Sequence, residues 1–130
     1  MHVFKVMLSA ALFFTFTSCE HQAMLTYKVH NSTSAPLRVV TTNTNGRDTT
    51  TTISIPAHEQ ATIAIIAQGL SGVRNYKETG DSLHELTGID VFRNDTVMAK
   101  TSFLNTSRWH YHQNNAHSAD YTSTVTDADF

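Results

Sequence analysis

Apolar and polar residues alternate along much of the chain from residue 25 onwards. The alternation is clearest at 25–30 and 108–112, where every second residue is apolar or aromatic. A period of two is typical of β-strands with one buried face, because successive side chains point to opposite faces. No segment holds a helical period beyond a single turn at 83–86. The pattern therefore predicts eight strands, at 25–30, 37–42, 49–55, 61–67, 89–93, 96–103, 108–112 and 121–125.

Turn-forming sequences separate these strands. Asn45-Gly46 is a strong hairpin signal, and Asn94-Asp95 lies between two further strands, so we expect a hairpin at each. Short strands about 8–12 residues apart favour a sandwich of two antiparallel sheets. The most apolar stretch, ATIAIIA at 61–67, is expected at the centre of the fold. Residues 113–119 and the longer segment Gln68–Ser82 are expected to be loops.

The stretch ISIPAHEQATIAI resembles the strand–turn–strand segment of immunoglobulin-like domains, in which a Pro-x-x-Glu corner joins two strands. The resemblance covers thirteen residues and favours a sandwich. We therefore expect residues 24–130 to form a single antiparallel β-sandwich of the immunoglobulin-like type, with about seven or eight strands.

The first nineteen residues have a different character. After a weakly basic start, residues 6–16 are apolar apart from two hydroxyl residues. This run is shorter than the ~20 residues that cross a bilayer, but it fits the ~7–15 apolar residues of a secretory signal. It ends in FTSC at 16–19, which resembles the lipobox of bacterial lipoproteins and the looser boxes of small Bacteroidota envelope lipoproteins. The resemblance implies a lipoprotein signal peptide at 1–18 and a lipid on Cys19.

Cys19 is the chain's single cysteine, so it cannot form an intrachain disulfide. A cysteine thiolate is readily alkylated, and two acyl chains suffice for stable anchoring. Residues 19–23 would be the lipidated cysteine and a short linker, which holds the domain within ~15 Å of the lipid. In enteric bacteria, an Asp directly after the lipidated cysteine retains a lipoprotein in the inner membrane. This chain has Glu20 at that position instead, so the resemblance implies the outer membrane. The alternative is a free, packed thiol.

Composition and charge exclude some partners. The formal net charge is −2, and the nine Lys and Arg residues are scattered. Nucleic-acid binding and attraction to anionic lipid both need clustered basic residues, so neither is expected. The threonine-rich stretch TTNTNGRDTTTTIS suits an exposed strand face. No motif calls for a cofactor, and none is expected.

Three histidines are candidate metal ligands. His110 and His112 are two residues apart on a predicted strand, so both imidazoles lie on one side, as in many metal sites of β-proteins. His117 and Asp120 on the following segment would complete a tetrahedral set. The alternative is an outward-facing strand surface, because the aromatic residues at 109 and 111 claim the inward face.

Gly80-Asp81-Ser82-Leu83 spells the motif that names the GDSL esterases and lipases, in which the serine is the nucleophile. An Asp-x-x-His sequence overlaps it and ends at His84, although that family places this element near the C-terminus. The family motif follows an apolar strand in an α/β fold, and both features are missing here. We interpret the match as a chance tetrapeptide and expect no enzymatic activity.

Three Asp-Ser/Thr triplets resemble the O-glycosylation sites that Bacteroidota use on exported proteins. They make Thr49, Ser82 and Thr96 candidate attachment sites, each at a predicted turn or strand start.

The sequence thus predicts a lipid-anchored envelope β-sandwich with a non-enzymatic binding or structural role. Its expected partners are the membrane, through the lipid, and an envelope protein or glycan bound by exposed strand edges or by Gln68–Ser82. The alternatives are a metal-binding lipoprotein that uses His110 and His112, or a small esterase that uses Ser82.

Overall fold

The fold was obtained as a computed structural model that describes residues 22–43 and 49–130. Eight strands and three short 3-10 helices make up this part of the chain. The strands are β1 (Met24–Asn31), β2 (Leu37–Asn43), β3 (Thr49–Ile55), β4 (Gln60–Ala67), β5 (Leu86–Arg93), β6 (Val97–Met98), β7 (His110–Asn115) and β8 (Ser118–Val125). The 3-10 helices are η1 (Val73–Tyr76), η2 (Thr106–Arg108) and η3 (Asp127–Asp129). Within these ranges, no helix has the length and apolarity that a membrane span requires.

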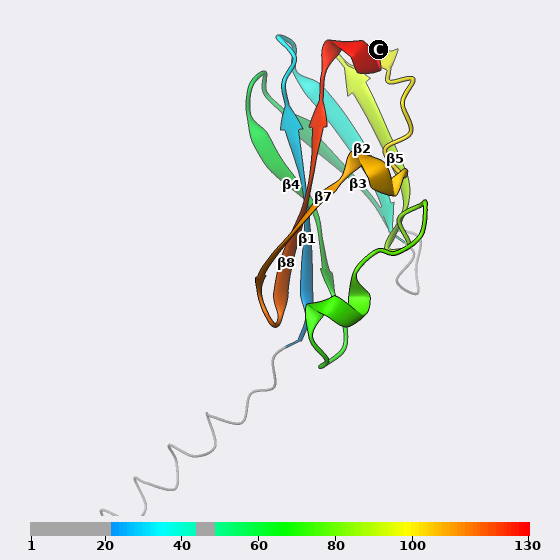
Figure 1. The fold of residues 1–130 in the computed structure, drawn as a ribbon. Coiled ribbons are helices and arrows are strands. Elements are labelled where there is room, and N and C mark those ends of the chain that lie inside the picture. The colour runs from blue at the N-terminus through cyan, green and yellow to red at the C-terminus, as the bar shows by residue number, and fades with distance from the viewer. Residues whose placement is uncertain (1–21, 44–48) are drawn as a thin grey trace, which may run out of the picture.

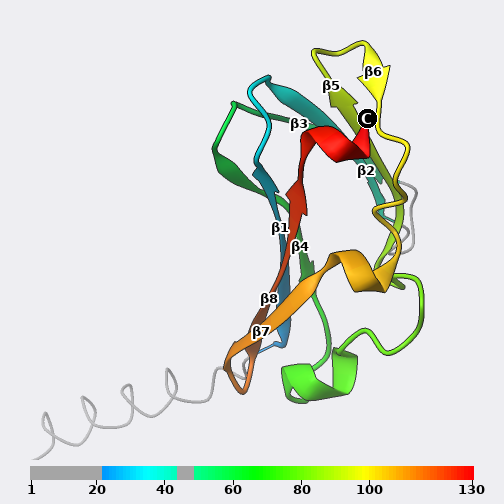
Figure 2. The same cartoon turned by 45° about the horizontal axis from the view of Figure 1, so that its top comes forward.

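The strands form two four-stranded sheets, with the orders β4-β1-β8-β7 and β3-β2-β5-β6. The two sheets face each other and open apart toward the end where β1 begins (Figures 1 and 2). Neighbouring strands are antiparallel except β1 and β8, which run parallel over eight residue pairs. The predicted all-β sandwich is confirmed.

The core lies between the sheets and is built by the period-two pattern. In β1 the buried residues alternate with half-buried ones along the whole strand, as expected for a strand with one face on the core. Large side chains from both sheets and from the segments that connect strands are fully buried: Tyr27, Tyr121, Phe103, Leu25, Leu37, Ile55, Ile66, Leu86, Val29, Val39, Val73 and Val91. The indole N–H of Trp109 donates to the main-chain oxygen of Phe103 at 2.7 Å, so its polar atom is satisfied inside the core.

Both predicted hairpins are present. β2 and β3 pair antiparallel, while Asn45-Gly46 lies outside the described residues. β5 and β6 pair across Asn94 and Asp95, whose φ angles of 52° and 60° lie in the left-handed region that these residue types tolerate. The Pro56–Glu59 corner joins β3 to β4, which belong to opposite sheets.

The structure corrects two predicted strands. The prediction of a strand at 96–103 is wrong beyond Val97–Met98, because the chain turns away: Lys100 N–H donates to the carbonyl of Asp129 at 2.7 Å. The prediction that 61–67 is central is also wrong, because β4 is an edge strand. Its Ile65 is 59 % exposed, whereas Ile63 and Ile66 face the core.

The predicted loop at 113–119 is wrong as well. β7 continues to Asn115 and β8 begins at Ser118, so the turn between them is very short. The segment between β4 and β5 is a loop as predicted, with η1 as its helical part.

Candidate functional site

A shallow cleft of about 730 Å³ lies between η1 and the turn that joins β7 to β8. It opens at the end of the sandwich where β1 begins, since an adjoining cavity of about 470 Å³ shares two lining residues with it and also touches Gln22 and Met24. The residues that line the cleft are Gly72, Arg74, Asn75, Gln113, Asn114, Asn115 and Ala116.

The two walls of the cleft are joined by a main-chain hydrogen bond. Val73 N–H donates to the carbonyl of Ala116 at 2.8 Å, and the Val73 side chain is fully buried. Gly72 allows this close approach, because a Cβ at that position would lie 3.1 Å from the same carbonyl oxygen. The sequence thus fixes the spacing of the walls through one small residue and one buried apolar residue.

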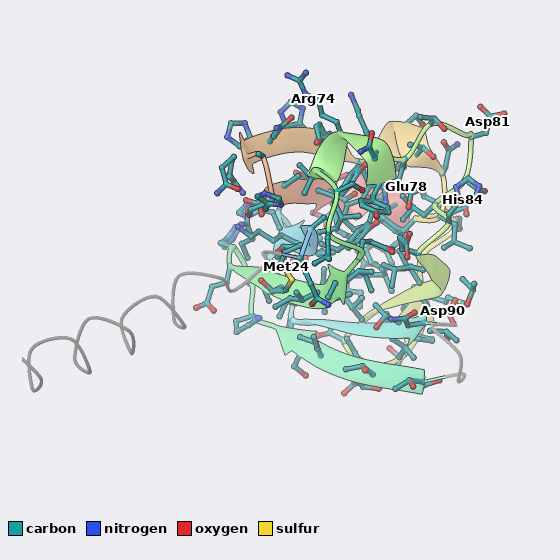
Figure 3. All side chains as sticks on the ribbon, turned by 90° about the horizontal axis from the view of Figure 1, so that it is seen from below. Met24, Arg74, Glu78, Asp81, His84 and Asp90 are labelled. Carbon is teal, nitrogen blue, oxygen red and sulfur yellow. The ribbon has the colours of Figure 1, made fainter. Side chains whose placement is uncertain are left out.

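Amide groups and one cation dominate the cleft. Arg74 Nε donates to Gln113 Oε1 at 3.3 Å, and Gln113 Nε2 donates to the carbonyl of Asn115 at 3.1 Å. Among the residues that the structure describes, the Asn75 amide has no hydrogen-bond partner, and the cleft lining contains no carboxylate. Seen from this end of the molecule, the Arg74 side chain extends outward (Figure 3). The cleft therefore offers unused hydrogen-bond donors and acceptors beside a positive charge.

The loop that carries η1 is held by a buried carboxylate, Glu78, whose side chain is 2 % exposed. Its oxygens accept hydrogen bonds from the Tyr27 hydroxyl at 3.2 Å and from the main-chain N–H of His84 at 2.9 and 3.0 Å. The main-chain N–H of Glu85 donates to Glu78 Oε1 at 3.3 Å, and Nδ1 of the His84 ring lies 3.0 Å from Glu78 Oε2. Because an ionised carboxylate only accepts, His84 Nδ1 carries the proton in this pair. Figure 3 shows Glu78 turned into the molecule toward His84.

Two stacked tyrosines form the floor under Glu78. The rings of Tyr27 and Tyr121 are 5.1 Å apart and nearly parallel, and the Tyr121 hydroxyl accepts a hydrogen bond from Glu78 N–H at 2.7 Å. Burial and the negative charge of Glu78 raise the pKa of Tyr27. Burial, together with the same charge, raises the pKa of Tyr121 to about 12. The pKa of Glu85 is raised as well, mainly by burial and to a smaller extent by the negative charge of Glu78.

These contacts tie the loop between β4 and β5 to sheet strands β1 and β8. The Glu78 cluster, defined as Glu78 with Tyr27, Tyr121 and His84, thereby positions η1 against the β7–β8 turn and holds the cleft in shape. No pattern in the sequence indicates this cluster, because Glu78 stands in a polar, glycine-containing stretch that is typical of a solvated loop.

The predicted histidine ligands do not converge. His110 and His112 are exposed on β7, with Asp120 paired opposite His112, and His117 lies in the turn beside them. Within residues 22–43 and 49–130, no group of three or more His, Cys, Asp or Glu side chains is placed to hold a metal ion. The metal site stays a prediction without support from this geometry.

Ser82 lies on the surface and forms an isolated β-bridge with Asn105. The nearby His84 ring contacts Glu78 instead, and in the described part of the chain no histidine side chain is hydrogen-bonded to the Ser82 hydroxyl. The constellation that an esterase needs, a serine beside a base, is not assembled among these residues.

The remaining candidates concern modification. Thr49, Ser82 and Thr96 are all exposed, as attachment of a sugar requires. Cys19 lies outside the described residues, as does Asp48 of the first triplet.

Comparisons of the chain with protein-family models, with curated proteins and with solved structures found no match.

Proposed function

We propose that this chain is a lipid-anchored β-sandwich of the bacterial envelope that binds a glycan and catalyses no reaction. The observation that carries the proposal is the cleft between η1 and the β7–β8 turn, with its four side-chain amides and Arg74. The lipobox-like FTSC at 16–19 supports the anchored location.

The chemistry of the lining favours a sugar. Each sugar hydroxyl both donates and accepts a hydrogen bond, and a side-chain amide offers both functions in one plane. Arg74 adds a positive charge that would favour an acidic sugar or a phosphorylated one. An open cleft lined by amides and a cation suits such a ligand better than it suits an apolar small molecule, which needs an enclosed apolar pocket.

The position of the cleft agrees with a role at the membrane surface. Gln22, which lines the adjoining cavity, comes three residues after Cys19. An extended chain of that length reaches at most about 11 Å. A lipid on Cys19 would therefore hold this end of the domain next to the membrane, within reach of surface glycans.

Anchoring is tested by the intact mass of the full chain, expressed in a bacterium and extracted from its membrane with detergent. We expect the wild type to lack residues 1–18 and to carry acyl mass on Cys19. The Cys19→Ser variant should keep its signal segment and gain no lipid. A wild type with an unmodified Cys19 would contradict the proposal.

Glycan binding is tested with the same material on an immobilised panel of neutral and acidic oligosaccharides. We expect Arg74→Ala and Asn75→Ala each to weaken binding about fivefold, the equivalent of about 1 kcal/mol for one hydrogen bond. Gln60→Ala, an exposed amide on β4, is the matched control and should bind as the wild type does. Equal binding by all four proteins, or binding by none, would refute the glycan site.

A further inference from the structure

Within the described ranges 22–43 and 49–130, the two sheets have four edge strands, and three of them carry features that discourage further pairing. The register of β4 shifts against β1, and that of β7 shifts against β8. β6 is only two residues long. Native proteins use bulges and short strands in this way, because an open edge exposes unpaired main-chain N–H and C=O groups to other chains.

β3 differs from the other three edges. It pairs with β2 over seven residues in unbroken register, and its sequence TTTTISI contains no charge, no proline and no glycine. All of its residues except Ser54 are β-branched, the type best suited to strands. Thr50, Thr51, Thr52 and Ser54 are exposed, and the strand lies at the rim of the molecule (Figure 3).

We propose that the β3 edge pairs antiparallel with β3 of a second copy of this chain, so that two β3-β2-β5-β6 sheets join into one. Twofold pairing centred on Thr52 places Thr52 opposite its own copy and Thr50 opposite Ser54. Hydroxyl pairs of this kind are favourable across strands, whereas like charges would repel. Because twofold pairing sets a strand against itself, an uncharged hydroxyl-bearing edge is self-complementary.

Pairing through one strand edge buries less surface than the ~1,200–2,000 Å² of a stable interface. The dimer is therefore weak, and its population rises with concentration. Antiparallel pairing also turns one copy end for end, so the two β1 starts lie at opposite ends of the dimer. If Cys19 is lipidated, as the proposed function requires, the dimer joins two facing membranes rather than two copies in one membrane.

The test is the protein mass of the detergent-extracted full chain, measured by light scattering over a concentration series. We expect the wild type to approach twice the monomer mass and Thr52→Lys to remain monomeric. Gln60→Lys adds the same charge to an exposed position on β4 and should behave as the wild type. A wild-type mass that stays at the monomer value, or a mass that Thr52→Lys leaves unchanged, overturns the proposal.

Cross-linking gives a second measurement. Thr52→Cys should form a disulfide-linked dimer under mild oxidation, because residues opposite each other in a sheet lie within disulfide reach. Thr124→Cys, an exposed position on β8, should show no more dimer than the wild type; equal yields from the two cysteines overturn the proposal. Vesicles that carry the wild type should cluster and those with Thr52→Lys should not. Failure of the chain to attach to vesicles would refute the anchor alone.

Discussion

Replacing Glu78 with alanine would leave several donors without an acceptor. The Tyr27 hydroxyl and the main-chain N–H groups of His84 and Glu85 all point to this carboxylate. Alanine also opens a gap where a side chain with 2 % exposure now packs. We therefore expect a substantial loss of stability, together with release of the loop that carries η1.

The size of the loss follows from the individual contacts. A hydrogen bond to a charged group contributes about 1.5–3 kcal/mol. The Glu85 contact at 3.3 Å is long, and the His84 side chain is 74 % exposed, so water can replace its ring contact. The loss is therefore counted from two hydrogen bonds to the carboxylate, those donated by the Tyr27 hydroxyl and by the His84 main-chain N–H. Together they contribute about 3–5 kcal/mol. For a domain of this size, that corresponds to a fall in Tm of roughly 12–20 °C.

Urea unfolding followed by tryptophan fluorescence measures this loss. Trp109 is the chain's single tryptophan, and its ring meets Tyr27 edge-on at 5.7 Å, so it reports on the cluster itself. Glu59→Ala, an exposed carboxylate in a turn, is the control and should change stability by less than about 0.5 kcal/mol. If Glu78→Ala destabilised the domain no more than this control, the assigned role of the carboxylate would be wrong.

Three further predictions concern the same end of the molecule and its core. The pKa of Tyr121 is raised to about 12 in the folded protein, and that of Tyr27 is also raised, so both hydroxyls ionise at a lower pH in the unfolded chain than in the folded one. The free energy of unfolding should therefore fall between pH 10 and 12, and it should fall less steeply in Tyr27→Phe. Urea titrations at stepped pH would show this, and a flat profile would contradict it. Gly72→Ala should cost about 1 kcal/mol in urea unfolding by crowding the Ala116 carbonyl, and it should weaken glycan binding; unchanged stability would contradict the crowding, and unchanged binding would contradict its effect on the cleft. Trp109→Phe should lower stability by about 1–3 kcal/mol in thermal unfolding, because it strands a buried carbonyl, and an unchanged Tm would refute this.

Strand positions were readable from the sequence where apolar and polar residues alternate without a break. In β1 and in the second half of β8 the inward residues alternate strictly, so a period of two marked these segments, whereas the polar residues around Ser118–Asp120 hid the start of β8. The place of a strand within its sheet was not readable in the same way. β4 is apolar enough for a central strand, yet one of its isoleucines faces solvent and no strand pairs with its outer side among the residues described.

The candidate site was harder to predict, because its parts come from distant segments. Glu78 reaches Tyr27 across 51 residues and Tyr121 across 43. No local pattern distinguishes a loop carboxylate that will be buried by such partners from one that remains in water. The composition of Gln68–Ser82 predicts a loop, and the structure confirms this one. The opposite wall of the cleft falls within 113–119, where the polar sequence predicts a loop but the end of β7 lies.

The parallel pairing of β1 with β8 has a mechanical consequence. The described chain starts at one end of the molecule and finishes at the other (Figure 1), with these two strands side by side over eight residue pairs. A force that pulls the two ends apart draws β1 and β8 in opposite directions along their length. The hydrogen bonds between them are then loaded together in shear, whereas a hairpin pulled at its open end unzips bond by bond. A domain held at its first strand and pulled at its last would therefore resist extension strongly.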